Sequence, residues 1–177
     1  MKKIAIVVCL ILSFLFIYLL QVNFFSWFNI AGVKPNLFVI LVLVIGLFSG
    51  KSMGTAFGIS FGLALDFFVG KNIGIYAVSL GIIGFLGGYL DRNFSKDSRV
   101  TLITMTVLAT VVFEMITYAL YYFIQSAQLN SIYFFKTLAI EILFNSIIMI
   151  IIYPIILKWG YKIEENFKEN NILTRYF

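Results

Sequence analysis

Long apolar runs separated by short polar breaks dominate the pattern of this chain. Six such runs can be marked, and each ends where charged, polar or turn-forming residues begin. A straight helix needs about 20 apolar residues to cross the hydrocarbon core of a membrane. The pattern therefore predicts an all-α integral membrane protein with helices at residues 4–22, 35–48, 52–69, 73–90, 100–124 and 133–157.

The lengths of these runs leave the number of membrane spans open. The first, fifth and sixth runs are long enough to span, whereas the second is short and the third and fourth are borderline. Short helices occur at membrane depth when they tilt or when the protein shields a re-entrant segment. We expect about six transmembrane helices, with five as the alternative. They form one membrane domain over residues 1–177, in which 157–177 is a short cytoplasmic tail.

Composition excludes several functional classes. Hydrophobic residues make up 62% of the chain and charged residues 12%, and the mean hydropathy is +1.02. A soluble domain of 177 residues could not bury that much apolar surface. The net charge of +5 includes no basic tract dense enough for nucleic acid. With no histidine and one cysteine, Cys9, neither an internal disulfide nor a Cys/His metal site can form, and no cofactor is expected.

Lysine and arginine are distributed unevenly between alternate loops. If the N-terminus is cytoplasmic, only Lys34, Lys71 and Lys136 of the 13 basic residues face outward. Because cytoplasmic loops carry the excess of positive charge, this bias predicts that both termini lie inside. Residues 23–34, which include Trp27 and several phenylalanines, are expected to lie along the outer membrane surface.

Glycine forms the strongest local pattern. It recurs every fourth position and is interrupted once, by Asp66, in the series Gly46, Gly50, Gly54, Gly58, Gly62, Asp66, Gly70 and Gly74. Within the third run, Gly54, Gly58 and Gly62 form a stripe that lets another helix backbone approach closely. We favour packing within the protein itself, and a partner-binding face is the alternative.

Asp66 lies in the outer part of the third run, where an unpaired carboxylate would be costly. Two interpretations remain open for it. Asp66 is either a binding or coupling residue, or it anchors the helix end at the interface with Lys71 as its partner.

Three polar residues interrupt the last two runs. Glu114 lies near the middle of the fifth, and Glu141 and Asn145 share one face of the sixth because they are four residues apart. We expect these three residues to form a buried hydrogen-bonded cluster between helices, with a proton on at least one carboxyl group. A proton path or substrate site is the alternative. The Glu114–Glu141 pair is also the nearest approach to a catalytic dyad, and we expect no enzyme.

The segment 34–91 resembles the rod-shape-determining protein MreD family. The resemblance lies in Lys34-Pro35-Asn36 at the start of the second run and in Gly62-x-x-x-Asp66 at the end of the third. It continues in Ile73-Gly74 and in Gly88-Tyr89-Leu90. Pro35, Asp66 and Gly74 match the family pattern in residue type, and the second half of the chain matches in hydropathy.

The resemblance implies a function and partners. Members of this family sit in the bacterial cytoplasmic membrane and belong to the cell-elongation machinery that controls peptidoglycan synthesis. They associate with the bitopic membrane protein MreC. Through MreC they are linked to MreB filaments, a glycosyltransferase and a transpeptidase. They are not known as enzymes, so a non-catalytic scaffold is expected.

A second family shares the six-helix, glycine-rich appearance. The substrate-binding components of energy-coupling-factor vitamin transporters are similar in this respect, and the resemblance implies that the two families share a fold. The alternative function is therefore a vitamin-transporter component. A transporter component of this kind needs a polar ligand pocket, and the short, poorly charged outer loops give little support for one.

Overall fold

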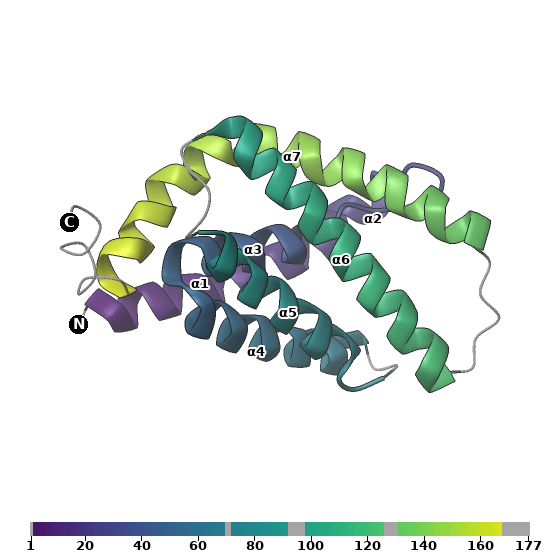
Figure 1. The fold of residues 1–177 in the computed structure, drawn as a ribbon, viewed down its shortest axis with the longest axis horizontal. Coiled ribbons are helices and arrows are strands. Elements are labelled where there is room, and N and C mark those ends of the chain that lie inside the picture. Colours follow the sequence, from purple (N-terminus) through teal and green to yellow (C-terminus); the bar gives the residue numbers. More distant parts are fainter. Residues whose placement is uncertain (1, 70–71, 92–97, 126–130, 168–177) are drawn as a thin grey trace.

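The computed structural model describes residues 2–69, 72–91, 98–125 and 131–167 (Figure 1). Within these ranges each of the six apolar runs forms a helix, and the only β-type pairing is one bridge between Ile30 and Val33. The six helices are α1 (Lys2–Leu19), α3 (Leu37–Ser49), α4 (Lys51–Val69), α5 (Ile75–Leu90), α6 (Arg99–Gln125) and α7 (Ser131–Phe167).

The first helical segment runs further than the sequence pattern predicts. After α1, a π-helical turn (η1, Leu20–Phe24) leads into the short helix α2 (Phe25–Trp27), so the helical path ends five residues after the predicted end at Val22. A turn around Gly32, which has a φ of 84°, then reverses the chain. The aromatic residues of the segment 23–34 therefore lie partly in a helix and partly near a turn.

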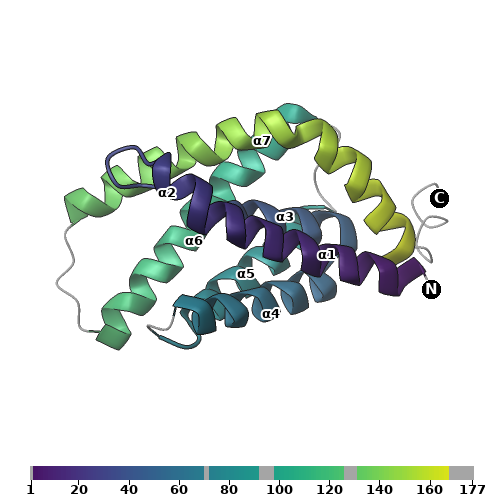
Figure 2. The same cartoon turned by 180° about the vertical axis from the view of Figure 1, so that it is seen from behind.

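α3 is the central helix of the bundle. Twelve of its 13 residues are buried, and it packs against α1, α4, α5, α6 and α7. Figures 1 and 2 show it between α1 on one side and α5 on the other. A helix that is apolar all round is enclosed by protein rather than set at a polar surface. This enclosure explains how the second apolar run can be short, because the neighbouring helices cover nearly the whole surface of α3.

α7 also differs from its prediction. It continues to Phe167, ten residues beyond the predicted end at Leu157, and it holds Pro154 inside the helix. Figure 1 shows that α7 bends in its yellow-green stretch, and proline is a common cause of such bends. The last turns pack on the core because Gly160 leaves space for the ring of Phe48. Residues 158–167 of the expected tail are therefore packed helix, and 168–177 lie outside the described residues.

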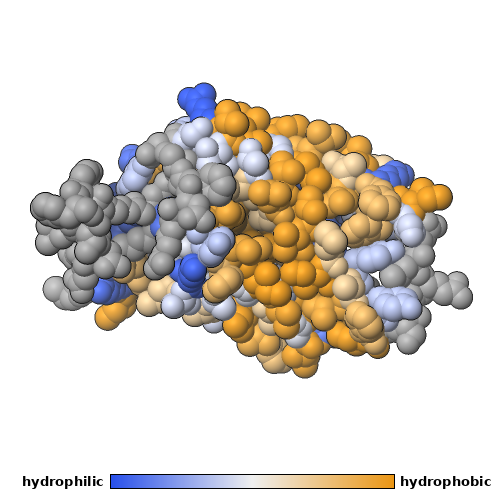
Figure 3. Space-filling model, in the orientation of Figure 1, coloured by the Kyte–Doolittle hydropathy of each residue, from blue (hydrophilic) through white to orange (hydrophobic). Residues whose placement is uncertain are grey.

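Four of the described helical segments are long and apolar enough to cross a membrane: Lys3–Trp27, Lys51–Val69, Arg99–Ile124 and Ser131–Phe167. The apolar helices α3 and α5 are shorter. Figure 3 shows a broad apolar surface over the middle of the molecule, with hydrophilic residues toward the two ends. These features identify an all-α membrane protein. The number of spans and the inside position of the termini stay predictions.

Candidate functional site

The glycine stripe of α4 lies directly against the backbone of α5. A Cβ atom at Gly58 would lie 2.8 Å from the carbonyl carbon of Leu80 and 3.0 Å from the Cα of Gly81. A Cβ at Gly54 would collide with the carbonyl oxygen of Gly84, and one at Gly62 would collide with the backbone around Ala77. Only glycine therefore permits this approach of the two helices.

Glycines of α5 complete the interface from the opposite side. A Cβ at Gly84 would meet the carbonyl group of Gly54, and one at Gly87 would lie 2.6 Å from the carbonyl oxygen of Leu43 on α3. At these glycines the backbones of α3, α4 and α5 therefore lie in direct contact. Because α5 fills the stripe on α4, that stripe has no space for a partner helix.

Asp66 joins the end of α4 to the start of α5. Its side chain is 1% exposed, and both carboxylate oxygens accept backbone hydrogen bonds. Oδ2 accepts from the N–H of Gly74 at 2.9 Å and of Ala77 at 3.1 Å, and Oδ1 accepts from Tyr76 at 3.0 Å. The first N–H groups of a helix lack partners within it, and the positive end of the helix dipole favours an anion. Asp66 therefore caps α5 from a distance.

Gly74 gives the chain the backbone geometry that this cap requires. It precedes the first residue of α5 with a φ of 107°, a left-handed conformation that glycine adopts at little cost. Lys71, the expected partner of Asp66, lies outside the described residues. Asp66 and Gly74 are thus joined by a hydrogen bond from the backbone N–H of Gly74 to the Asp66 carboxylate, which the spacing of the glycines did not predict.

Asn145 of α7 lies at a junction of three helices. It is 0% exposed, and its Oδ1 accepts a hydrogen bond from the backbone N–H of Asn36 at 2.9 Å. Its Nδ2 donates to Thr110 Oγ1 of α6 at 3.0 Å, while Thr110 itself donates to the carbonyl oxygen of Thr106. One amide side chain therefore ties α6, α7 and the start of α3.

Pro35 lies beside this junction and is buried. Its carbonyl oxygen accepts a hydrogen bond of 2.6 Å from Gln21 Nε2, and Gln21 Oε1 accepts from the N–H of Leu37 at 3.4 Å. The Asn36 side chain in turn accepts from Val39 as the N-cap of α3. The start of α3 is thus held by polar groups from both η1 and α7.

Glu141 lies one turn before Asn145 on the same face of α7 and is 4% exposed. Its carboxyl group is within hydrogen-bonding reach of Glu114 on α6 and of Asn36 and Asn145. Its Oε1 atom has no hydrogen-bond partner, and neither has the buried Oγ1 of Thr137 one turn earlier. The structure therefore brings Glu114, Glu141 and Asn145 together.

Replacing Asn145 by alanine should lower the stability of the bundle. The change leaves the Asn36 N–H without its acceptor and removes the bond to Thr110, which together should cost about 2 kcal/mol. Thermal unfolding of the purified protein in mild detergent would measure the loss. Asn23→Ala is the matched control, because Asn23 is exposed and bonds only to the carbonyl oxygen of Leu19 in its own helix. Equal unfolding temperatures for the two variants would contradict the structural role of Asn145.

Sequence reasoning missed Thr110, Asn36 and Gln21 as members of this site. Thr110 resembles an ordinary polar residue in an apolar helix, and its separation from Asn145 is 35 residues. Asn36 lies 109 residues from Asn145 along the chain. The one available signal was the helical spacing in α6, since Thr110 precedes Glu114 by one turn and so shares its face.

This arrangement defines the class of the protein, which is a polytopic helical membrane protein whose buried polar groups join its helices. A sequence model of the family described as rod shape-determining protein MreD matches residues 1–163. The chain therefore belongs to the MreD family, a membrane protein family with a role in rod shape determination that is not known as enzymatic. No curated protein and no solved structure matches the chain significantly. The expected likeness to vitamin-transporter components stays a prediction.

Proposed function

We propose that this protein is a non-catalytic membrane scaffold of the bacterial cell-elongation complex. In that role it regulates cell shape and peptidoglycan synthesis by binding partner membrane proteins. The observation that carries the proposal is the family match over residues 1–163 of the 177-residue chain. The buried polar groups support it, because the side chains of Asp66 and Asn145 make hydrogen bonds that join one helix to another. The family match does not favour the vitamin-transporter alternative.

The proposed setting is the bacterial plasma membrane, with six spans and both termini in the cytoplasm. The excess of basic residues on one side of the six helices supports this orientation. α3 and α5 would then cross the membrane region as short helices. The packing around α3 supports this, because neighbouring helices rather than lipid cover its surface.

The proposed partner is an MreC-like bitopic membrane protein, which links the scaffold to MreB filaments, a glycosyltransferase and a transpeptidase. Since the glycine stripe is occupied by α5, the contact surface must lie elsewhere. The outer aromatic segment, residues 24–28, is suitable because Phe24, Trp27 and Phe28 expose between 51% and 89% of their surface. Aromatic residues are enriched where protein surfaces bind each other.

Depletion of the protein in its native cell tests the proposal. We expect the cells to lose their elongated shape, and we expect the tagged protein to recover an MreC-like partner from detergent extracts. Normal shape together with recovery of an ATPase module, or a requirement for an external vitamin, would contradict the scaffold and favour transport.

The outer aromatic segment gives a sharper test of the contact surface. Trp27→Ala should lower recovery of the partner about tenfold or more without lowering the amount of folded protein, because a buried interface tryptophan typically contributes about 2 kcal/mol or more. Phe123→Ala is the control, since Phe123 is 78% exposed near the end of α6 and Trp27 is 89% exposed. Similar partner recovery for both variants would exclude the segment as the contact surface.

A further inference from the structure

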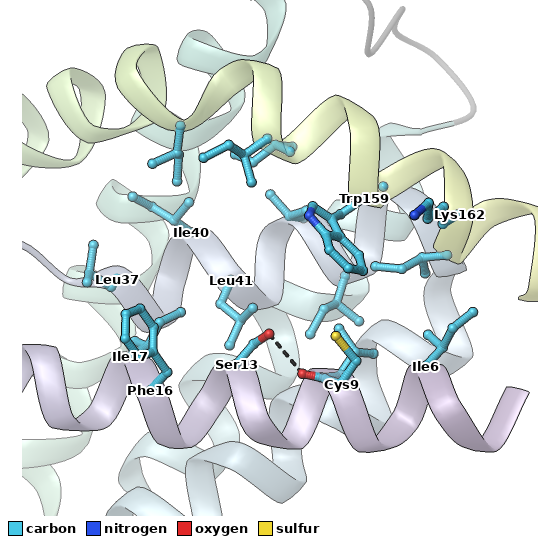
Figure 4. Close-up of a pocket in the computed structure, with 18 of the residues that line it drawn as sticks. Ile6, Cys9, Ser13, Phe16, Ile17, Leu37, Ile40, Leu41, Trp159 and Lys162 are labelled. Atoms are coloured by element: carbon cyan, nitrogen blue, oxygen red, sulfur yellow. Dashed lines mark hydrogen bonds between the residues drawn. The ribbon is translucent and has the colours of Figure 1, made fainter. Parts of the chain in front are cut away.

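A groove of about 1030 Å³ runs between α1, α3 and α7. Figure 4 shows α1 along one side, with Leu41 and Ile40 of α3 behind and Trp159 of α7 projecting into the space. The lining residues of α1 include Ile6, Cys9 and Ser13, and they recur at the three- and four-residue spacing of one helix face. One face of α1 therefore borders the groove, and some of its residues, such as Ile6 and Ile17, also pack against the core.

α1 is held to the bundle at only a few points. Leu10 and Phe14 are its buried hydrophobic residues, and the ring of Phe14 stacks on Phe61 of α4 with centroids 4.6 Å apart. Further along, Tyr18 meets Phe68 with centroids 4.7 Å apart. These contacts fix the position of α1 but leave the space between α1 and α7 unfilled by side chains.

The chemistry of the lining differs between the two ends of the groove. At the end where α1 begins and α7 finishes, Lys162, Glu165 and Asn166 line the groove, whereas Leu20, Phe25 and Leu37 line the opposite end. The Lys162 ammonium lies 4.7 Å from the centroid of the Trp159 ring. Lys162 and Glu165 are the charged residues of the lining, and with Lys3, Lys158 and Glu164 near the same end lysines outnumber glutamates there by three to two.

This asymmetry indicates what fills the groove. Water is unsuitable because the lining is apolar over most of its length, and an empty apolar space loses the dispersion contacts of its walls. A partner helix about 10 Å wide would meet the Trp159 ring, which projects into the space toward the end of the groove that Lys162 lines (Figure 4). Flexible hydrocarbon can pass beside an indole ring. Tryptophan and lysine at one end are the residues that favour a lipid headgroup.

We propose that this groove is a binding site for one phospholipid with an anionic headgroup. Its acyl chains lie along the α1 face that carries Cys9 and Ser13, and its phosphate lies beside Lys162 and Trp159. In the proposed topology this lipid belongs to the cytoplasmic leaflet. The lipid completes the contact between α1 and α7, and the site does not depend on the scaffold function.

Lipid retention by the full-length protein tests the site. Protein delipidated in mild detergent is mixed with phosphatidylglycerol or phosphatidylcholine and analysed by native mass spectrometry. We expect saturable binding of one phosphatidylglycerol, about fivefold tighter than phosphatidylcholine, which matches the contribution of one lysine near a lipid headgroup. Lys162→Gln should remove this preference, whereas Lys158→Gln should retain it, because Lys158 does not line the groove.

A pair of variants on α1 tests the place of binding. Ser13→Trp adds an indole to the groove, where the Ser13 hydroxyl now donates to the Cys9 carbonyl at 2.8 Å (Figure 4). It should abolish the saturable binding, whereas Leu12→Trp should not, because Leu12 is 60% exposed on another face of α1. Equal lipid retention by the two variants would overturn the proposal. Binding without saturation or headgroup preference would also overturn it, since it would show unspecific surface lipid only. If Ser13→Trp does not fold, the Lys162→Gln comparison decides.

Discussion

Gly58→Leu should yield no folded protein, and Gly58→Ala should already be strongly destabilised. The Cβ of alanine would lie 2.8 Å from the carbonyl carbon of Leu80 and 3.0 Å from the Cα of Gly81. These are backbone atoms, so α4 and α5 must separate along their length to admit even one methyl group. Forcing such a group into a packed interface costs about 3 kcal/mol. Monodisperse yield in mild detergent and the temperature of thermal unfolding would measure the effect.

Gly81→Ala is the matched control for this experiment. It places the same methyl group on the facing helix, but the nearest atom is the side-chain Cγ1 of Ile59 at 2.8 Å. Relieving this contact needs only a rotation of Ile59 about χ1, which a helix restricts, and the cost is offset by the roughly 1 kcal/mol by which alanine favours a helix over glycine. The control should therefore unfold close to the wild-type temperature. Equal destabilisation by Gly58→Ala and Gly81→Ala would show that close backbone approach is not what holds α4 to α5.

Asp66→Ala should have an effect of similar size through a different cause. It leaves the N–H groups of Gly74, Tyr76 and Ala77 without their acceptors in a site that is 1% exposed. An unsatisfied buried donor costs about 1–3 kcal/mol, so the loss should be roughly 4 kcal/mol in total. The protein should then be recovered at low level, and its thermal unfolding should shift strongly downward.

Asp66→Asn separates the two interpretations of this residue. Asparagine keeps one acceptor oxygen and the shape of the side chain, so a capping role predicts stability between that of wild type and that of Asp66→Ala. A binding or coupling role predicts wild-type stability with loss of rod shape in complemented cells. An Asp66→Asn protein that unfolds like wild type would therefore argue against the cap as the main role of the residue.

The sequence predicts the helices well because apolar periodicity is a local property. Each of the six runs forms a helix, and the four-residue spacing of Glu141 and Asn145 places both on one face of α7. Helix ends were harder to predict. The apolar pattern placed the end of the last run at Leu157, yet Gly160 packs against Phe48 and the helix continues to Phe167.

Contacts between distant residues account for what the sequence could not predict. Asp66 caps a helix that begins nine residues later, whereas the familiar capping patterns connect residues about three apart. The backbone N–H of Asn36 bonds to Asn145 from 109 positions away. Such pairs depend on how whole helices pack against each other, so local spacing carries no signal for them.

The shortness of α5 has a consequence for the lipids around it. At 1.5 Å per residue its 16 residues span about 24 Å, less than the roughly 30 Å hydrocarbon thickness of a typical bilayer. Its outer face exposes Val78, Phe85 and Tyr89. If this face meets lipid, neighbouring acyl chains must shorten or tilt, which costs fractions of a kcal/mol per Å of mismatch. That elastic strain would decrease when another membrane protein covers the face, so bilayer deformation alone would draw neighbours toward α5.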